Sequence, residues 1–163
     1  MMKRIVWAAL ACAAVTSAQA EPVRKIVGSW IVSSEEDRFG EGGTYVAMTL
    51  DDTANAFGVR CIERQLTLAL MPGTASDEPL EKGQQFSIKL RTDKGPVQDL
   101  KGGAINARLI QMDATPELVR MVRGGKETAL RYETERGTSR TLVFTTRDNA
   151  KAFARVASEC KVD

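Results

Sequence analysis

The alternation of apolar and polar residues is the strongest pattern in this chain, and its period of two predicts β-strands. Residues 29–33 predict a first strand and residues 44–50 a second, on which Val46, Met48 and Leu50 share one face. Further strands of the same kind are expected at residues 57–62, 66–70, 86–91, 97–100, 107–112, 128–134 and 139–145. Many short alternating strands separated by turn residues favour a small antiparallel β-sandwich or barrel.

Two segments have helical patterning instead. Thr115 supplies a capping side chain before Pro116 at the first helical position, and the glycine pair at 124–125 ends that short helix. A second helix is expected from about residue 147 to residue 160. Its inward face has residues three or four positions apart: Ala150, Phe153, Ala157 and Cys160. We therefore expect a mainly β protein with a C-terminal helix packed on the sheet.

The first twenty residues have the three parts of a secretory signal peptide. Two basic residues come first, residues 5–15 are apolar, and residues 18–20 form an A-x-A cleavage site. The apolar run is too short to span a bilayer. We expect residues 1–20 to be a cleaved signal, residues 21–163 to form one domain, and the mature protein to lie in the periplasm. Release outside the cell and lipid attachment at Cys12 remain as alternatives.

Cleavage after Ala20 leaves two cysteines, Cys61 and Cys160. Strand phase places Cys61 on the same face as Phe57 and Val59, and helix phase turns Cys160 inward. Both thiols therefore face one core, and in an exported chain we expect a disulfide between them. In the chain-entropy model, closing a loop of roughly 100 residues stabilises a protein by up to about 4–5 kcal/mol. Two buried free thiols are the alternative.

Charge and composition argue against several classes of function. Removing Lys3 and Arg4 from the 23 basic residues leaves 21, which equals the number of acidic residues, so we expect no nucleic-acid-binding surface. The chain has no histidine, which excludes Ser-His-Asp and Cys-His arrangements and the usual catalytic zinc sites. The acidic clusters at 35–37 and 51–52 lie in loops and are expected to be solvated. We predict no enzyme, no cofactor and no metal.

One segment imitates a calcium-binding loop. Asp51, Thr53 and Asn55 match the start of a D-x-[DN]-x-[DN] motif. Ala56 and Ile62 occupy the positions where such a loop requires glycine and glutamate. A hairpin turn is therefore the better interpretation.

Four residues stand out as candidates for binding. Trp30 opens the domain close to Gly28, and anchoring of the core is the alternative role for such a large aromatic side chain. Arg60 precedes Cys61 and lies on the opposite face of its strand. Arg91 and Asp93 stand at the end of another strand. Structural ion pairs at the sheet edge are the alternative for these three residues.

These landmarks, in this order, resemble a known family. Gly28-Ser29-Trp30, then Arg60-Cys61, then Arg91-Thr92-Asp93 and the helix ending in Cys160 are similar to the small periplasmic TagO family associated with type VI secretion. The tryptophan-led opening also resembles, more faintly, the invasion-associated locus B family, although this chain lacks further cysteines near the tryptophan. Both resemblances imply accessory or host-interaction roles, without catalysis, in the envelope of Gram-negative bacteria.

The first functional hypothesis is thus a periplasmic accessory protein that acts by contact with an unidentified envelope or host protein. The alternative is an inhibitor of a secreted hydrolase such as lysozyme, which would insert residues 35–43 or 74–84 into the cleft of its target. An enzyme that uses carboxylates ranks last. The oligomeric state cannot be deduced from the sequence.

Overall fold

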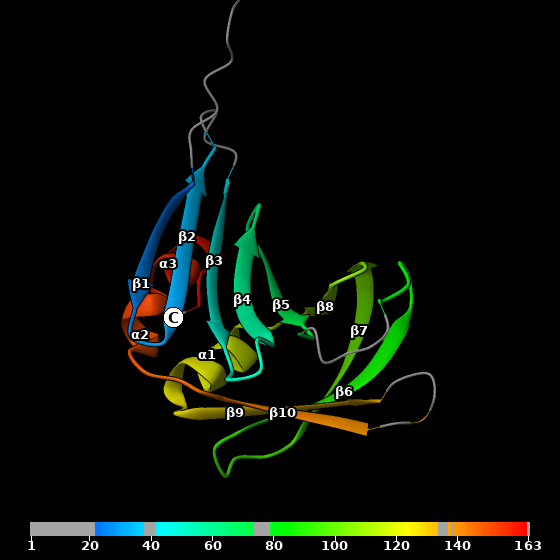
Figure 1. Cartoon of the computed structure of the whole chain (residues 1–163). Helices are drawn as coiled ribbons and strands as arrows, with labels where there is room; N and C mark the ends of the chain where they lie inside the picture. Colours follow the sequence, from blue (N-terminus) through cyan, green and yellow to red (C-terminus); the bar gives the residue numbers. More distant parts are fainter. Residues whose placement is uncertain (1–21, 38–41, 74–78, 134–136, 138, 163) are drawn as a thin grey trace, which may run out of the picture.

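Ten antiparallel strands form a sheet in the computed structural model, which describes residues 22–37, 42–73, 79–133, 137 and 139–162 (Figure 1). The strand order is β1-β2-β3-β4-β5-β8-β7-β6-β9-β10. The strands are β1 (Val23–Val27), β2 (Trp30–Glu36), β3 (Gly43–Leu50), β4 (Ala56–Ile62), β5 (Gln65–Met71), β6 (Gln85–Thr92), β7 (Gln98–Asn106), β8 (Leu109–Asp113), β9 (Glu127–Glu133) and β10 (Ser139–Thr145). The mainly β, antiparallel prediction is confirmed.

The sheet folds back over its own core. The rings of Phe57 on β4 and Phe144 on β10 lie 5.6 Å apart, although five strands separate β4 from β10 in the sheet order. Figure 1 shows the two parts of this sheet, with β1–β5 running across the direction of β9 and β10. The arrangement is sandwich-like, as the alternation of short strands predicted.

Two parts of the sheet differ from the sequence prediction. The pattern did not reveal β1, because Arg24 and Lys25 interrupt its apolar residues and all but its last position are exposed. β1 pairs with β2 through a tight turn at Gly28, where φ is +60° and an added Cβ would lie 2.5 Å from the carbonyl oxygen of Arg147. β7 extends to Asn106, well beyond the predicted segment, since its two glycines carry no apolar signal.

Helix α1 (Pro116–Gly124) confirms the first helix prediction. The Thr115 hydroxyl accepts a hydrogen bond from the backbone N–H of Leu118 at 3.2 Å, as expected for an N-cap. Leu118, Val119 and Val122 are buried and join the core.

The C-terminal helix is broken in two, which corrects part of the prediction. α2 (Asn149–Ala152) and α3 (Ala154–Cys160) meet at Phe153, which caps both and packs its ring 4.7 Å from that of Trp30. The break changes the helical phase, so Ala150 is exposed and Asn149 is buried in its place. Ala157 and Cys160 do face inward, as predicted.

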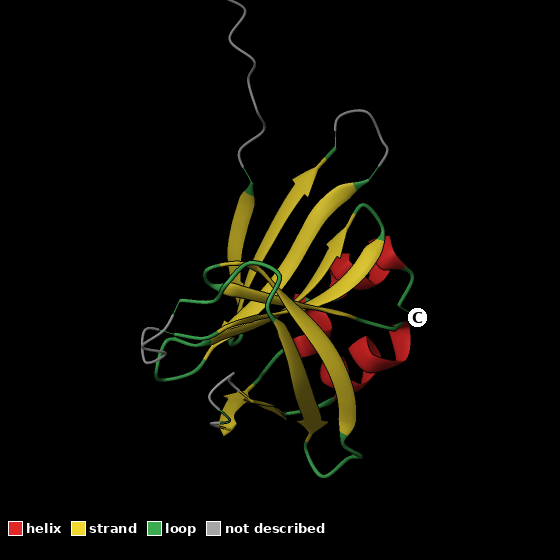
Figure 2. Ribbon diagram, turned by 90° about the vertical axis from the view of Figure 1, so that its right-hand side faces the viewer, coloured by secondary structure: helices red, strands yellow, loops and turns green. Residues whose placement is uncertain are grey.

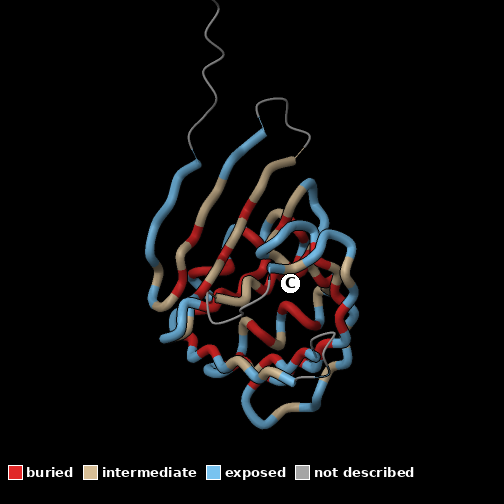
Figure 3. Tube along the Cα trace, turned by 45° about the vertical axis from the view of Figure 1, so that its right-hand side comes forward, coloured by how far each residue is buried: buried red, intermediate tan, exposed pale blue. Residues whose placement is uncertain are grey.

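The Cys61–Cys160 disulfide is present and ties α3 to β4, with a Cα–Cα distance of 5.9 Å. Arg155 adds two further contacts between α3 and the sheet: it pairs with Glu36 and lies 5.1 Å above the ring of Tyr45. The helices therefore cover one face of β1–β5 (Figure 2). Buried residues gather where the sheet faces these helices, and the edge strand β1 is exposed along nearly its whole length (Figure 3).

Strand register assigns an inner and an outer face to β1–β5. One inner row runs through Trp30, Thr49, Phe57 and Leu70, all of which are buried. Val46, Met48 and Leu50 do share a face of β3, but it is the outer one. In the part of the chain that the structure describes, no helix is long and apolar enough to cross a membrane.

Candidate functional site

The structure does not bring the four predicted binding residues together. Trp30 lies in the core, Arg91 and Asp93 lie at the end of β6, and Arg60 lies on the outer face of β4. Each residue therefore has to be judged by the groups that it contacts.

Trp30 anchors the core and has no exposed surface. Its side chain is 0% exposed, and its indole Nε1–H donates to Oδ1 of Asn149 at 2.9 Å. The Nδ2 group of Asn149 in turn donates to the carbonyl oxygens of Gly125 at 2.5 Å and Val122 at 3.3 Å. One buried amide thereby joins β2, α2 and the end of α1. Trp30 offers nothing for a partner to contact in this conformation.

Arg91 and Asp93 stabilise the connection between α1 and β9. The Asp93 carboxylate accepts hydrogen bonds from the backbone N–H groups of Lys126 at 3.1 Å and Glu127 at 2.9 Å. The Nε–H of Arg91 donates to the backbone carbonyl oxygen of Asp93 at 3.0 Å. The Asp93 contacts join segments more than thirty residues apart, whereas the Arg91 contact is local, so Asp93 has the structural role and Arg91 supports its turn.

Arg60 differs from the exposed Arg91 because its guanidinium is half-buried and both of its acceptors are neutral side chains. Its Nε–H donates to the Thr67 hydroxyl at 3.2 Å, and its Nη2 donates to Oε1 of Gln111 at 2.5 Å. No carboxylate pairs with Arg60 in the described ranges, and in register Asp113 lies two strands away, beyond Thr67. Burial lowers the pKa of Arg60, because removal from water disfavours its charged form.

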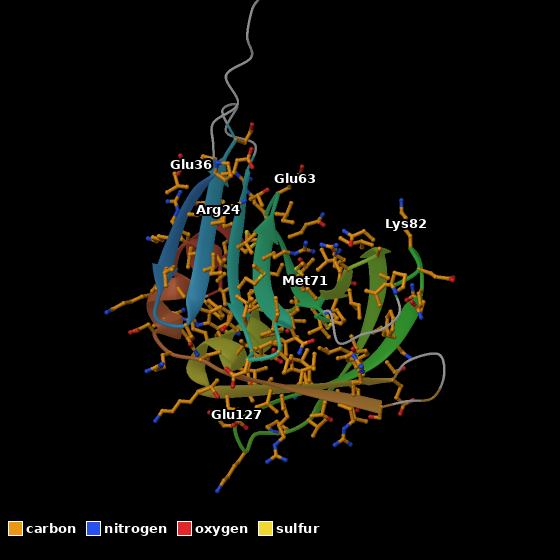
Figure 4. All side chains as sticks on the ribbon, viewed as in Figure 1. Arg24, Glu36, Glu63, Met71, Lys82 and Glu127 are labelled. Carbon is orange, nitrogen blue, oxygen red and sulfur yellow. A yellow bond between two sulfur atoms is a disulfide. The ribbon has the colours of Figure 1, made fainter. Side chains whose placement is uncertain are left out.

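An apolar row crosses the outer face beside Arg60. Ile26, Ile31 and Met48 are directly opposite one another on β1, β2 and β3. Ile26 is 80% exposed, and Leu50, on the same face, is 46% exposed. We call this surface the Arg60 face and define it by Ile26, Ile31, Val46, Met48, Leu50 and Arg60. It looks toward the viewer in Figure 1, and Figure 4 labels Arg24 and Met71 at its margins.

The outer face of the other half of the sheet has the opposite character. There Asp99, Lys89, Arg131 and Thr141 form one register row on β7, β6, β9 and β10. Lys89 pairs with Asp99 at 2.6 Å, and a groove of about 300 Å³ lies among these charged side chains. The apolar row is therefore a property of one half of the sheet. It is also unlike the charged surface that a solvated sheet face usually has.

The segment resembling a calcium loop is a hairpin turn. Both oxygens of the Asp51 carboxylate accept hydrogen bonds: Oδ1 from the backbone N–H groups of Thr53 at 2.8 Å and Asn55 at 2.9 Å, and Oδ2 from the Asn55 amide at 2.7 Å. Burial alone would raise the pKa of Asp51, but the hydrogen bonds from Asn55 and Thr53 outweigh it, so the pKa is lowered. Among the described residues, no group of three acidic or cysteine side chains could hold a metal.

Several predictions fall outside the described residues. The signal peptide, with Cys12, lies there entirely, and residues 38–41 and 74–78 lie within the two loops that we considered as inhibitor loops. Cleavage of a signal peptide and inhibition of a hydrolase therefore stay predictions. The expectation that the 35–37 cluster lies in a loop is wrong for Glu35 and Glu36, which end β2 and pair with β3. Glu36 also pairs with Arg155.

Comparisons with known proteins define the fold. No protein-family model and no curated protein matches the chain. Among solved structures, the chain is similar to invasion associated protein B from Bartonella henselae, with 14% sequence identity and a TM-score of 0.54. The similarity covers 85% of this chain and 99% of that one. The two proteins share a fold. This finding agrees with the fainter of the two resemblances, and no comparison supports the resemblance to the TagO family.

Sequence reasoning found Arg60 but missed the surface around it. Met48 and Leu50 were visible as one face of a strand, yet nothing in the alternation says which face of a sheet is covered by helices. Ile26 belongs to β1, which the pattern did not reveal. The apolar row emerges only when the register of three strands is known.

Proposed function

We propose that this protein is an exported, non-catalytic accessory protein that acts by protein–protein contact at the bacterial envelope through the Arg60 face. The observation that carries the proposal is the apolar row on the outer sheet face, where Ile26 is 80% exposed and Ile31 and Met48 are half-buried. Protein interfaces combine an apolar centre with methionine and arginine side chains, and they are depleted in lysine and acidic residues. Ile31, Val46, Met48 and Arg60 match this composition, and the acidic residues of the same face, Glu35 and Asp113, lie at its margins.

Export to the periplasm is supported by the disulfide and by the predicted signal peptide. A buried Cys61–Cys160 bond is typical of proteins that fold in an oxidising compartment. Similarity of fold to an invasion associated protein is compatible with an accessory role at the envelope, although at 14% identity it carries no functional residue across.

Two carboxylates of the acidic clusters have structural partners within the protein. Asp51 is held by the donors of its own turn, and Glu36 is paired with Arg155 on α3. A pair of carboxylates for glycoside hydrolysis would instead have to flank an open cleft. Both side chains already have structural partners.

The test compares two single lysine substitutions in the full-length exported protein. Chemical crosslinking in intact cells, followed by mass spectrometry, should recover a discrete partner with the wild type. Met48→Lys places a charge in the apolar row and should abolish recovery. Thr145→Lys adds the same charge to the outer face of β10 and should leave recovery unchanged. Recovery of no partner above background, or equal recovery with both variants, would contradict the proposal.

A further inference from the structure

The guanidinium of Arg60 has N–H donors that are not used in the hydrogen bonds described above. An arginine side chain carries five N–H donors in a planar fork. Thr67 and Gln111 accept one hydrogen bond each, and among the described residues Arg60 has no other hydrogen-bond or ion-pair partner. Three N–H groups, including both on Nη1, therefore remain for another acceptor.

The charge of Arg60 is held in place without being compensated. Arg60 is half-buried, and its two acceptors are a neutral hydroxyl and a neutral amide. A cation that has lost part of its hydration is stabilised most by an anion. Thr67 and Gln111 already hold the Arg60 side chain in one rotamer. Binding of an anion would therefore cost little further side-chain entropy. The arrangement is pre-organised for an acidic group.

The surroundings of Arg60 define what carries that acidic group. Val46 lies directly opposite Arg60 on β3, and Met48 follows on the same face. In the next register row, Met48 is followed by Gly58 and Ala69, two small buried residues. A ligand that reaches Arg60 must therefore also cover the apolar side chains of Val46 and Met48.

A single carboxylate fits this site better than a phosphate-rich ligand. Arg24 is the other basic residue in the same register row, and it lies three strands away from Arg60. Polyanions such as nucleic acids are bound by several cations acting together. One planar guanidinium matches one carboxylate through two parallel hydrogen bonds.

We propose that Arg60 determines the specificity of the Arg60 face by pairing with an acidic side chain of the protein partner, an Asp or Glu that is flanked by apolar residues packing on Ile31, Val46 and Met48. This inference rests on the proposed function, because it specifies the chemistry of the partner at the same face. Docking would remove the ion pair from water and strengthen it.

The test uses the purified partner recovered by the wild-type protein. Dissociation constants are measured for the wild type, Arg60→Lys, Arg60→Gln and the control Arg91→Gln, whose arginine lies on β6 away from the face. Removing one partner of a buried charge pair should weaken binding by about thirtyfold or more in Arg60→Gln. The affinity of Arg60→Lys should lie between those of the wild type and Arg60→Gln. Arg91→Gln should bind as tightly as the wild type. The thermal unfolding midpoint of each variant verifies that it is folded.

Charge exchange then identifies the acidic residue. Arg60→Glu should abolish binding, and changing the interfacial Asp or Glu of the partner to Arg should restore it. If Arg60→Gln and Arg60→Lys both bind like the wild type while Met48→Lys does not, the proposed function stands and the role of Arg60 is overturned. If Met48→Lys also binds like the wild type, both the proposed function of the Arg60 face and the role of Arg60 are overturned.

Discussion

At the scale of single residues, the four candidates divide according to what they touch. Trp30 and Asp93 hold distant segments together, and the exposed Arg91 makes a local hydrogen bond to the backbone of Asp93. Arg60 is half-buried, is fixed by two neutral side chains and keeps three N–H groups for another acceptor. This division could not be predicted from the sequence, because the partner of Trp30 lies 119 positions away along the chain and the partners of Asp93 lie 33 and 34 positions away. The spacing of residues along the sequence does not predict such long-range contacts.

Trp30→Phe should lower the free energy of unfolding by about 1–3 kcal/mol, because it leaves Oδ1 of the buried Asn149 without a donor. Urea unfolding of the oxidised protein measures the change. Tyr132→Phe is the reference: it removes one polar atom from a buried aromatic side chain whose hydroxyl has no hydrogen-bond partner among the described residues, whereas Trp30→Phe also removes ring volume from the core. An equal loss in both variants would show that the indole bond is unimportant.

Asp51→Asn should lower the free energy of unfolding at neutral pH by about 1 kcal/mol, since solvent still screens the partly buried carboxylate. The folded state lowers the pKa of Asp51, so its contribution is fully present above the unfolded-state pKa of about 3.9. It is lost as the pH falls through the folded-state pKa. Urea titrations from about pH 7 down to about pH 3 should show the difference shrinking. A difference that grows on acidification would contradict the assignment.

At the scale of elements, the alternation located most strands and the capping pattern located α1. Prediction from these patterns failed for elements whose structure depends on the segments that they pair with or pack against. β1 is a strand because it pairs with β2, and its own residues show little alternation. The C-terminal helix breaks at Phe153, whose ring packs against Trp30, a contact between residues far apart in the sequence.

The break at Phe153 predicts that replacing Ala150 and Ala157 with leucine has different effects on the free energy of unfolding. A continuous helix would place Ala150 and Ala157 on the same buried face, whereas the structure exposes Ala150 and buries Ala157. Ala150→Leu should change the free energy of unfolding by less than about 0.5 kcal/mol. Ala157→Leu should cost about 1–3 kcal/mol through overpacking. Similar losses in urea unfolding for the two variants would indicate an unbroken helix.

The disulfide should matter most for α3. Replacing both Cys61 and Cys160 with alanine should lower the free energy of unfolding by up to about 4–5 kcal/mol. Hydrogen exchange should accelerate first in α3, because the packing of Val156 and Ala157 and the contacts of Arg155 remain but the covalent link to β4 is lost. β9, in the other half of the sheet, serves as the internal reference. Uniform acceleration across α3 and β9 would contradict a local role.

At the scale of the whole molecule, one sheet carries two unlike outer surfaces. The half formed by β1–β5 presents the apolar row and Arg60, and the half containing β6, β7 and β9 presents charged rows around a groove. The fold class could be predicted from alternation and turns. The asymmetry could not, because it depends on the strand register and on the face of β1–β5 that the helices cover. Contact through one half of the sheet is therefore the central claim.

Site-specific photo-crosslinking in intact cells tests that claim most directly. A photoreactive residue replaces Met48 on the apolar row in one variant and Lys89 on the charged half in the other. The account predicts a discrete protein adduct from position 48 and none from position 89. An adduct from position 89 alone, or none from position 48, would contradict it.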